Sequence, residues 1–167
     1  GDSIVGGAPI VKNGKGKVTF NNWNVTGPTT INGGTVSVTM LANNDGQYYG
    51  SLGTAKQSIT LNDGATLITD GVIFTHQQLN LSGETTINVP SGKSVDFYKG
   101  IKGAGATLIK TGAGSMEMGT DNTFSKLIIK QGSVTSNHNS NIVDQLPPTV
   151  EFQGGTLWGA NREGTRS

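Results

Sequence analysis

Residues 100–136 read GIKGAGATLIKTGAGSMEMGTDNTFSKLIIKQGSVTS, and this stretch decides the fold. Short apolar runs alternate in it with glycine-rich corners, and each run is at or below the average strand length of about five residues. The corner Lys110–Gly112 (Lys-Thr-Gly) recurs as Lys130–Gly132 (Lys-Gln-Gly), 20 residues later. That period is typical of one turn of a small β-solenoid, so the runs are predicted to be faces of a coil rather than arms of a hairpin. The runs are Ala106–Ile109, Met116–Met118, Leu127–Ile129 and the residues around Val134.

The same corner signature runs through the whole chain. In each copy a polar residue and a glycine predict a tight turn, and an aliphatic or β-branched residue shortly afterwards is predicted to point inward. From Gly92 onward the corner glycines are 20, 20 and 22 residues apart, whereas the earlier intervals are near 30, which indicates an insertion or a longer turn. The copies are Asn32–Val36, Asn62–Leu67, Pro90–Val95, Lys110–Met116, Lys130–Val134 and Phe152–Leu157.

These features predict an all-β chain folded as a right-handed parallel β-helix (β-solenoid) with short rungs of about 20 residues. About eight such rungs, stacked at roughly 4.8 Å, would form an elongated rod. Apolar residues nowhere repeat for two periods at helical spacing, so no helix is predicted. We assign residues 1–17 to a lead-in segment or cap, tag-derived in part, and residues 18–167 to a single solenoid domain that is a fragment of a longer protein.

Residues 103–134 resemble the autotransporter-associated β-strand repeat, which occurs in passenger domains of bacterial secreted and surface proteins. That motif combines a Leu-x-Lys-x-Gly-x-Gly corner, a short strand, an Asn-Thr-Phe segment and a second strand that ends in Gly-x-Val. The resemblance implies a parallel β-helix, and it implies structural roles for the residues of the motif. The matching positions are Leu108, Lys110, Gly112, Gly114, Met116, Met118, Asn122, Thr123, Phe124, Leu127, Ile129, Gly132 and Val134.

The composition narrows the classes of protein to consider. With 26 glycines at regular corners and only 14% charged residues, the chain does not fit disorder driven by charge repulsion. The net charge of +1 gives no basis for a nucleic-acid partner or for binding to an anionic membrane. Cysteine is absent, which excludes a disulfide framework and suits export as an unfolded chain. Apolar runs all fall short of the roughly 18 residues that cross a membrane.

Two stretches interrupt the repeat and are predicted to be loops, Ala42–Lys56 and Asn137–Pro148. The first is expected to project from the stack and contains the adjacent Tyr48 and Tyr49. Exposed aromatic faces stack on sugar rings or contact proteins. Tyr48 and Tyr49 are therefore the candidate contacts for a ligand or a partner.

Other side chains are expected to have structural roles. Trp23 and Trp158 are predicted to cover the ends of the apolar core. His76 and His138 are predicted to face solvent or lie in turns, because no His/Cys/Asp spacing resembles a metal site. Some asparagines are predicted to bond backbone groups at corners or between rungs, as buried polar groups require; these are Asn22, Asn80, Asn88 and Asn122.

The best pair of candidate catalytic carboxylates is Asp96 and Glu117. They are 21 residues apart, which is one rung, so they are predicted to be neighbours on one outer face. With Lys99 or Lys110 nearby, they would suit a polysaccharide lyase or a glycosidase, which needs two carboxyls about 5–10 Å apart in one cleft. Because most acids are expected to be solvated groups on outer faces, we predict no catalytic residue, no metal and no cofactor.

The function predicted from the sequence is a non-enzymatic structural or adhesive segment of a secreted or surface-exposed bacterial protein, associated with the outer membrane. It would act as a rod that displays binding loops. The expected partners are a host or bacterial surface protein or a glycan, together with self-association through the solenoid ends. Nucleic acid and direct membrane insertion are not expected. The alternatives are a carbohydrate-active β-helix enzyme of the lyase or hydrolase type and a carbohydrate-binding module.

Overall fold

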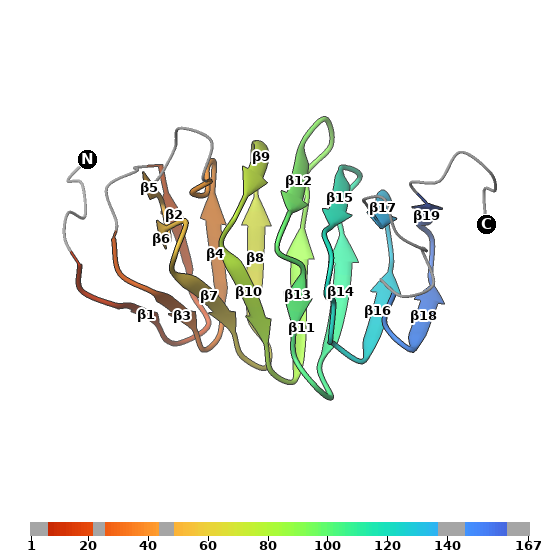
Figure 1. Ribbon diagram of the computed structural model, residues 1–167, viewed down its shortest axis with the longest axis horizontal. Coiled ribbons are helices and arrows are strands. Elements are labelled where there is room, and N and C mark those ends of the chain that lie inside the picture. Colours follow the sequence, from red (N-terminus) through yellow and green to blue (C-terminus); the bar gives the residue numbers. More distant parts are fainter. Residues whose placement is uncertain (1–6, 22–25, 44–48, 137–145, 160–167) are drawn as a thin grey trace.

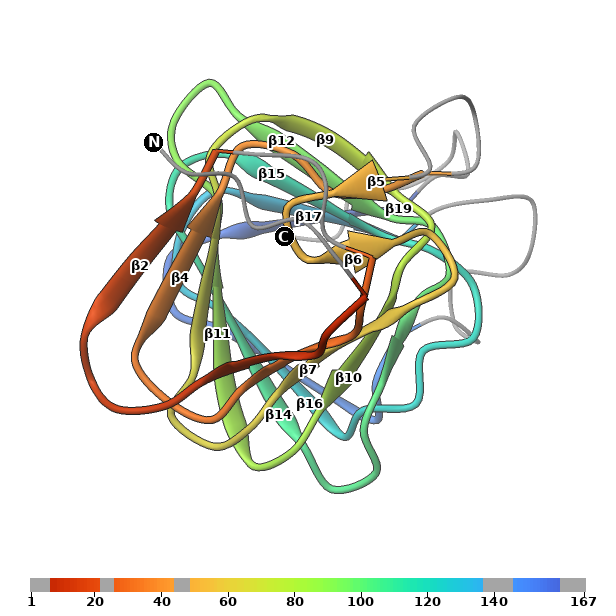
Figure 2. The same ribbon diagram turned by 90° about the vertical axis from the view of Figure 1, so that its left-hand side faces the viewer.

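The computed structural model describes residues 7–21, 26–43, 49–136 and 146–159. The regular secondary structure of these residues consists of strands alone, and the strands stack as a β-solenoid of about six turns with rungs of about 21 residues (Figure 1). Seen along the axis from the β1 end, the chain winds as a right-handed coil around a closed interior (Figure 2). The predicted all-β solenoid is therefore confirmed, with fewer turns than the eight expected.

Three parallel sheets form the faces of the coil, and we call them the first, second and third sheets. The first contains, in spatial order, β1 (Ile10–Lys12), β3 (Thr29–Ile31), β7 (Ser58–Leu61), β10 (Gln78–Leu81) and β13 (Ile101–Lys102). The second contains β2 (Lys17–Phe20), β4 (Thr35–Val38), β8 (Thr66–Thr69), β11 (Glu84–Asn88), β14 (Thr107–Thr111), β16 (Lys126–Ile129) and β18 (Thr149–Phe152). The third contains β9 (Val72–Thr75), β12 (Ser94–Phe97), β15 (Ser115–Met118), β17 (Ser133–Ser136) and β19 (Thr156–Gly159).

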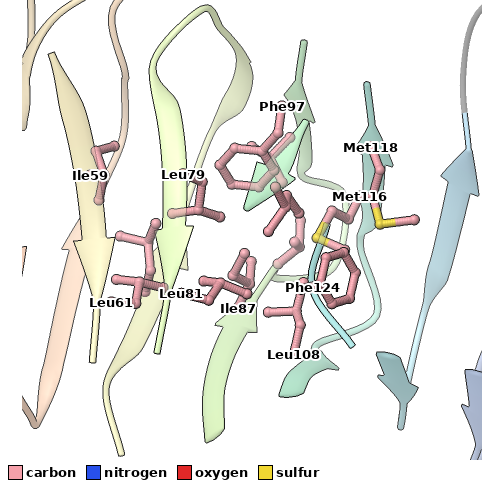
Figure 3. Packing of buried hydrophobic residues seen from close by; sticks show 14 of the residues in the cluster. Ile59, Leu61, Leu79, Leu81, Ile87, Phe97, Leu108, Met116, Met118 and Phe124 are labelled. Atoms are coloured by element: carbon pink, nitrogen blue, oxygen red, sulfur yellow. The ribbon is translucent and has the colours of Figure 1, made fainter. Parts of the chain in front are cut away.

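The strands pair in register, so that like side chains stack from rung to rung. Leu108 of β14 pairs with Leu127 of β16, for example, and Met116 of β15 pairs with Val134 of β17. Successive side chains of a strand point to opposite faces, and the inward set forms one continuous core. Figure 3 shows Phe124 in this core near Leu108 and Met116. Burial of each large apolar side chain contributes about 1.5–3 kcal/mol, which lets a chain with modest apolar content fold.

The predicted glycine corners are confirmed. The glycine of each of the six copies has positive φ, a conformation that residues with a Cβ adopt at a cost. The apolar residue after each corner is buried, with a relative exposure between 0 and 9%. These glycines are Gly34, Gly64, Gly92, Gly112, Gly132 and Gly154, and the buried residues are Val36, Leu67, Val95, Met116, Val134 and Leu157.

The stretch Ala42–Lys56 is not simply a projecting loop, and in this respect the sequence-based prediction was wrong. β5 (Tyr49–Gly50) and β6 (Gly53–Thr54) form an antiparallel pair within it. Ala42, Leu52 and Ala55 are buried, each with no more than 1% exposure. The insertion therefore adds to the core, and it accounts for the long interval between β4 and β8. The long interval from Gly64 to Gly92 has another cause, because Gly64 lies at the corner between the first and second sheets and Gly92 at the corner between the second and third.

The insertion is also bonded to the edge of the third sheet. The backbone N–H of His76, just after β9, donates to the carbonyl of Ala42 at 3.1 Å. The Gln77 side chain accepts from the N–H of Ala42 at 3.2 Å and donates to the carbonyl of Leu52 at 3.0 Å. Edge strands with free backbone groups recruit other chains, and this contact covers the end of β9 next to His76.

Candidate functional site

The outer side of the third sheet, which we call the third-sheet face, brings together aromatic and acidic side chains. Phe74 of β9 pairs in register with Asp96 of β12, and Asp96 pairs with Glu117 of β15. The same column continues through Thr135 of β17 to Trp158 of β19. The prediction that Asp96 and Glu117 are neighbours one rung apart on an outer face is thus confirmed.

Three rings pack together at the β9 end of this face. The centroids of Phe74 and His76 are 5.0 Å apart in an edge-to-face arrangement, and those of His76 and Tyr98 are 4.6 Å apart. Phe74 and Tyr98 lie 5.6 Å apart. Aromatic pairs at these separations attract each other, so the rings hold one another in place.

His76 and Tyr98 differ in their access to solvent. His76 is only 8% exposed and does not face solvent, but it lies at the corner between β9 and β10, which agrees with the other half of the prediction. Phe74 of the same rung and Tyr98 of the next rung pack against it, and the contact between rungs could not be read from the sequence. Tyr98 is 44% exposed and presents its ring to solvent beside Phe74.

A second constellation lies inside the corner between the second and third sheets. Lys110 is fully buried, and its ammonium group donates to the carbonyls of Thr111 at 2.9 Å, Gly112 at 2.8 Å and Gln131 at 3.1 Å. Burial lowers the pKa of Lys110 to about 8. The carbonyls act in the opposite direction, since they stabilise the charged form. Lys110 therefore ties its own corner to the corner of the next rung.

The sequence contains a second such corner that the repeat analysis missed. The ammonium of Lys12 donates to the carbonyls of Asn13 at 2.9 Å, Gly14 at 2.8 Å and Gly33 at 3.3 Å. Both corners have the sequence pattern Lys-x-Gly-x-Gly. This pattern was the only feature of the sequence that could have predicted the Lys12 corner. Residues 12–16 were assigned to the lead-in segment, whereas β1 and β2 on either side of them pair with the next rung.

The remaining motif residues also join adjacent rungs. The Asn122 side chain accepts from the N–H of Ile101 at 2.8 Å and donates to the carbonyl of Gly119 at 2.9 Å. The N–H of Thr123 donates to the carbonyl of Ile101 at 2.9 Å, and Phe124 is buried. The N–H of Gly114 donates to the carbonyl of Val89 at 2.9 Å.

Asparagines form a ladder at the corner between the first and second sheets. The Asn32 amide donates to Asn13 at 2.8 Å, and the Asn62 amide donates to Asn32 at 2.6 Å. The asparagines that were predicted to bond backbone groups are others. Of these, Asn88 donates to the hydroxyl of Thr111 at 3.0 Å, and Asn22 lies outside the described residues.

The predicted aromatic contacts are distributed over different parts of the coil. Tyr49 lies on β5 and is 51% exposed, while Tyr48, Trp23 and His138 lie outside the described residues. Trp158 is 45% exposed on the third-sheet face, so the prediction that it covers the end of the core was wrong.

Of the two lysines named as nearby bases for the alternative catalytic set, Lys110 does not join the carboxylates. The ammonium group of Lys110 points into the corner, where three backbone carbonyls surround it, and away from the outer face on which Asp96 and Glu117 lie. We call this arrangement of a lysine and three carbonyls a lysine cage. Among the described residues, no group of three His, Cys, Asp or Glu side chains is placed to hold a metal ion. The same part of the chain contains no helix long and apolar enough to cross a membrane.

Comparison with known proteins found no match to a protein-family model, to a curated protein or to a solved structure.

Proposed function

We propose that this chain is a non-enzymatic structural and adhesive segment of a secreted or surface-exposed bacterial protein of the autotransporter type. The observation that carries the proposal is the register of the parallel strands. Pairing continues from β1 and β3 at one end of the coil to β17 and β19 at the other, on three faces. A coil of this kind is stiff, because every rung is bonded to its neighbours.

The outer faces suit the display of side chains for binding. Parallel strands lie about 4.8 Å apart, so outward residues form evenly spaced columns along the rod. The two lysine cages and the asparagine ladder stabilise the corners and leave these columns free to vary. The resemblance of residues 103–134 to the passenger-domain repeat supports the placement of the rod at a bacterial surface.

Binding of the purified chain to cell surfaces tests this function. Fluorescently labelled protein is incubated with bacteria and with cultured epithelial cells, and bound label is measured by flow cytometry. We expect saturable binding that an excess of unlabelled protein displaces. Binding that does not saturate, or that unlabelled protein fails to displace, would contradict the adhesive function.

A carbohydrate-active enzyme is the second candidate, because Asp96 and Glu117 are register partners on one outer face. The test is the release of reducing ends or unsaturated products from a panel of neutral and acidic polysaccharides. We expect no turnover. Turnover that is lost in both Asp96→Asn and Glu117→Gln would replace the adhesive function with an enzymatic one.

A further inference from the structure

We propose that the third-sheet face is a glycan-binding site that takes neutral pyranose units, with Tyr98 as the stacking platform and Asp96 and Glu117 as hydrogen-bond acceptors. The proposal deepens the proposed adhesive function and rests on it. It names the class of ligand and the residues that recognise it.

The aromatic cluster provides a preformed platform. Tyr98 is 44% exposed, and its ring is fixed against His76 at 4.6 Å and Phe74 at 5.6 Å between centroids. The backbone of His76 is in turn bonded to the buried Ala42. A ring held in this way loses little conformational freedom on binding, which favours affinity. The weakly polar C–H face of a pyranose fits such an aromatic face.

The carboxylates lie on the same face as the platform. Asp96 pairs in register with Phe74, and the Phe74 ring packs against the Tyr98 ring with the centroids 5.6 Å apart. Glu117 pairs with Asp96 on the adjacent strand. Carboxylates are pure acceptors and sugar hydroxyls can donate, so the pair suits a ligand rich in hydroxyl groups. Because Oδ1 of Asp96 is buried, the ligand would be bonded through Oδ2 of Asp96 and through Glu117.

The charge of the face selects against acidic glycans. The outward residues of the described third-sheet strands contain two charged groups, and both are negative. Two lysines flank β12, of which Lys93 has its ammonium group 4.0 Å from a carboxylate oxygen of Asp70 and Lys99 follows Tyr98. An anionic sugar would place like charges side by side, which is unfavourable. The neighbouring outward column adds hydroxyl groups that bond sugar hydroxyls in either direction; its members are Ser94, Ser115, Ser133 and Thr156, in register.

The test uses immobilised oligosaccharides of three charge classes. The neutral probes are maltoheptaose, laminarihexaose and chitohexaose, the anionic probes are heparin and a hyaluronan octasaccharide, and the cationic probe is a chitosan hexamer. We expect the wild-type chain to bind at least one neutral probe and neither anionic probe. Preference for heparin or hyaluronan, binding to chitosan alone, or binding to no neutral probe at millimolar concentration would overturn the proposal.

Variants locate the site. Tyr98→Ala is expected to weaken binding to the neutral probe about fivefold, since loss of an aromatic stacking contact costs on the order of 1 kcal/mol. Tyr98→Phe keeps the ring and should retain most of the affinity. Tyr49→Ala is the matched control, because Tyr49 is exposed to a similar degree but lies on β5. Equal affinity of Tyr98→Ala and wild type would overturn the proposal, as would loss of affinity in Tyr49→Ala alone.

Neutralising the acids tests the charge argument. The double variant Asp96→Asn, Glu117→Gln keeps side-chain size and should bind the neutral probe several-fold more weakly, while its discrimination against hyaluronan decreases. Thermal unfolding of each variant, followed by circular dichroism, separates loss of binding from loss of fold. If cells bind the wild type and Tyr98→Ala equally, this site is wrong and the adhesive function stands. If cells do not bind the wild type, the adhesive function is itself wrong.

Discussion

The Lys12 and Lys110 corners have the same local structure in different surroundings. Each ammonium donates to two carbonyls of its own corner and one of the next rung. Lys12 joins the first sheet to the second, whereas Lys110 joins the second to the third. The Lys-x-Gly-x-Gly corner is therefore a module that works at either bend of the coil.

Their position in the stack is what differs. Lys110 pairs with Ile87 below and Ile129 above, and it is completely buried. Lys12 lies on β1, the outermost described strand of the first sheet, and is paired on one side with Ile31. The comparison teaches that the corner geometry is local, while the electrostatic cost of the lysine depends on the rungs around it.

The largest loss in the free energy of unfolding is expected when the glycine that packs against the carbonyls of a lysine cage is replaced by alanine. A Cβ at Gly132 would lie 2.5 Å from the Gly112 carbonyl oxygen, and φ at Gly132 is 71°. We expect Gly132→Ala to lower the free energy of unfolding by about 3 kcal/mol, from strain and overpacking together. Gly34→Ala makes the equivalent contact with the Gly14 carbonyl oxygen at the Lys12 corner and should lower the free energy of unfolding as well. Chemical denaturation measures both.

Gly64→Ala is the control for this pair. Gly64 has a similar φ of 81°, but no atom lies within 4 Å of an added Cβ. Its cost should be limited to backbone strain, about 1–2 kcal/mol. If Gly64→Ala and Gly132→Ala cost the same, the carbonyl cage does not constrain the corner.

Replacement of each lysine by methionine tests how its position in the stack affects its contribution to the free energy of unfolding. Lys110→Met leaves three carbonyls without their charged donor, and we expect a loss of about 2 kcal/mol in unfolding free energy. Lys12→Met should cost about half as much, because water can reach a corner in the outermost rung and satisfy its carbonyls. The measurement is again chemical denaturation at neutral pH. A larger loss for Lys12→Met would contradict the comparison.

The pH dependence of stability sharpens the comparison further. Burial lowers the pKa of Lys110 to about 8 from the ordinary value of 10.5, so between these values the unfolded chain binds more protons than the folded chain. Stability from this group therefore rises with pH over that window and is lost as pH falls through about 8. The unfolding free energy of wild type minus that of Lys110→Met should increase from pH 7.5 to 10. A flat or falling difference would show that the carbonyls offset burial.

The sequence was sufficient for the coil and its corners but not for the contacts between distant segments. Positive φ at Gly92 and Gly112 follows from local turn chemistry, and the pairing of Asp96 with Glu117 follows from the rung length. The buried insertion was missed because its buried apolar residues, Ala42, Leu52 and Ala55, are isolated among polar residues and glycines and show no alternation that would predict a strand.

The candidate site was predicted only in part for the same reason. The carboxylates were placed on one face by their spacing, but the aromatic platform depends on His76, which is buried by rings from two rungs. The Lys12 cage was missed because a lysine-rich terminal segment is ordinarily solvated, whereas here the carbonyls of the next rung complete the cage.

The smallest effect concerns the side chains outside the two cages. The Lys12 corner has an asparagine ladder in which Asn32 accepts from Asn62 and donates to Asn13. The residue that corresponds to Gly33 at the Lys110 corner is Gln131, which contributes its backbone carbonyl. We expect Asn32→Ala to cost about 0.5–1 kcal/mol, because its two hydrogen bonds are exposed to water. Gln131→Ala should change the unfolding free energy by less than about 0.5 kcal/mol, as surface substitutions do. If the two variants cost the same, the ladder adds nothing, and the two corners differ only in burial.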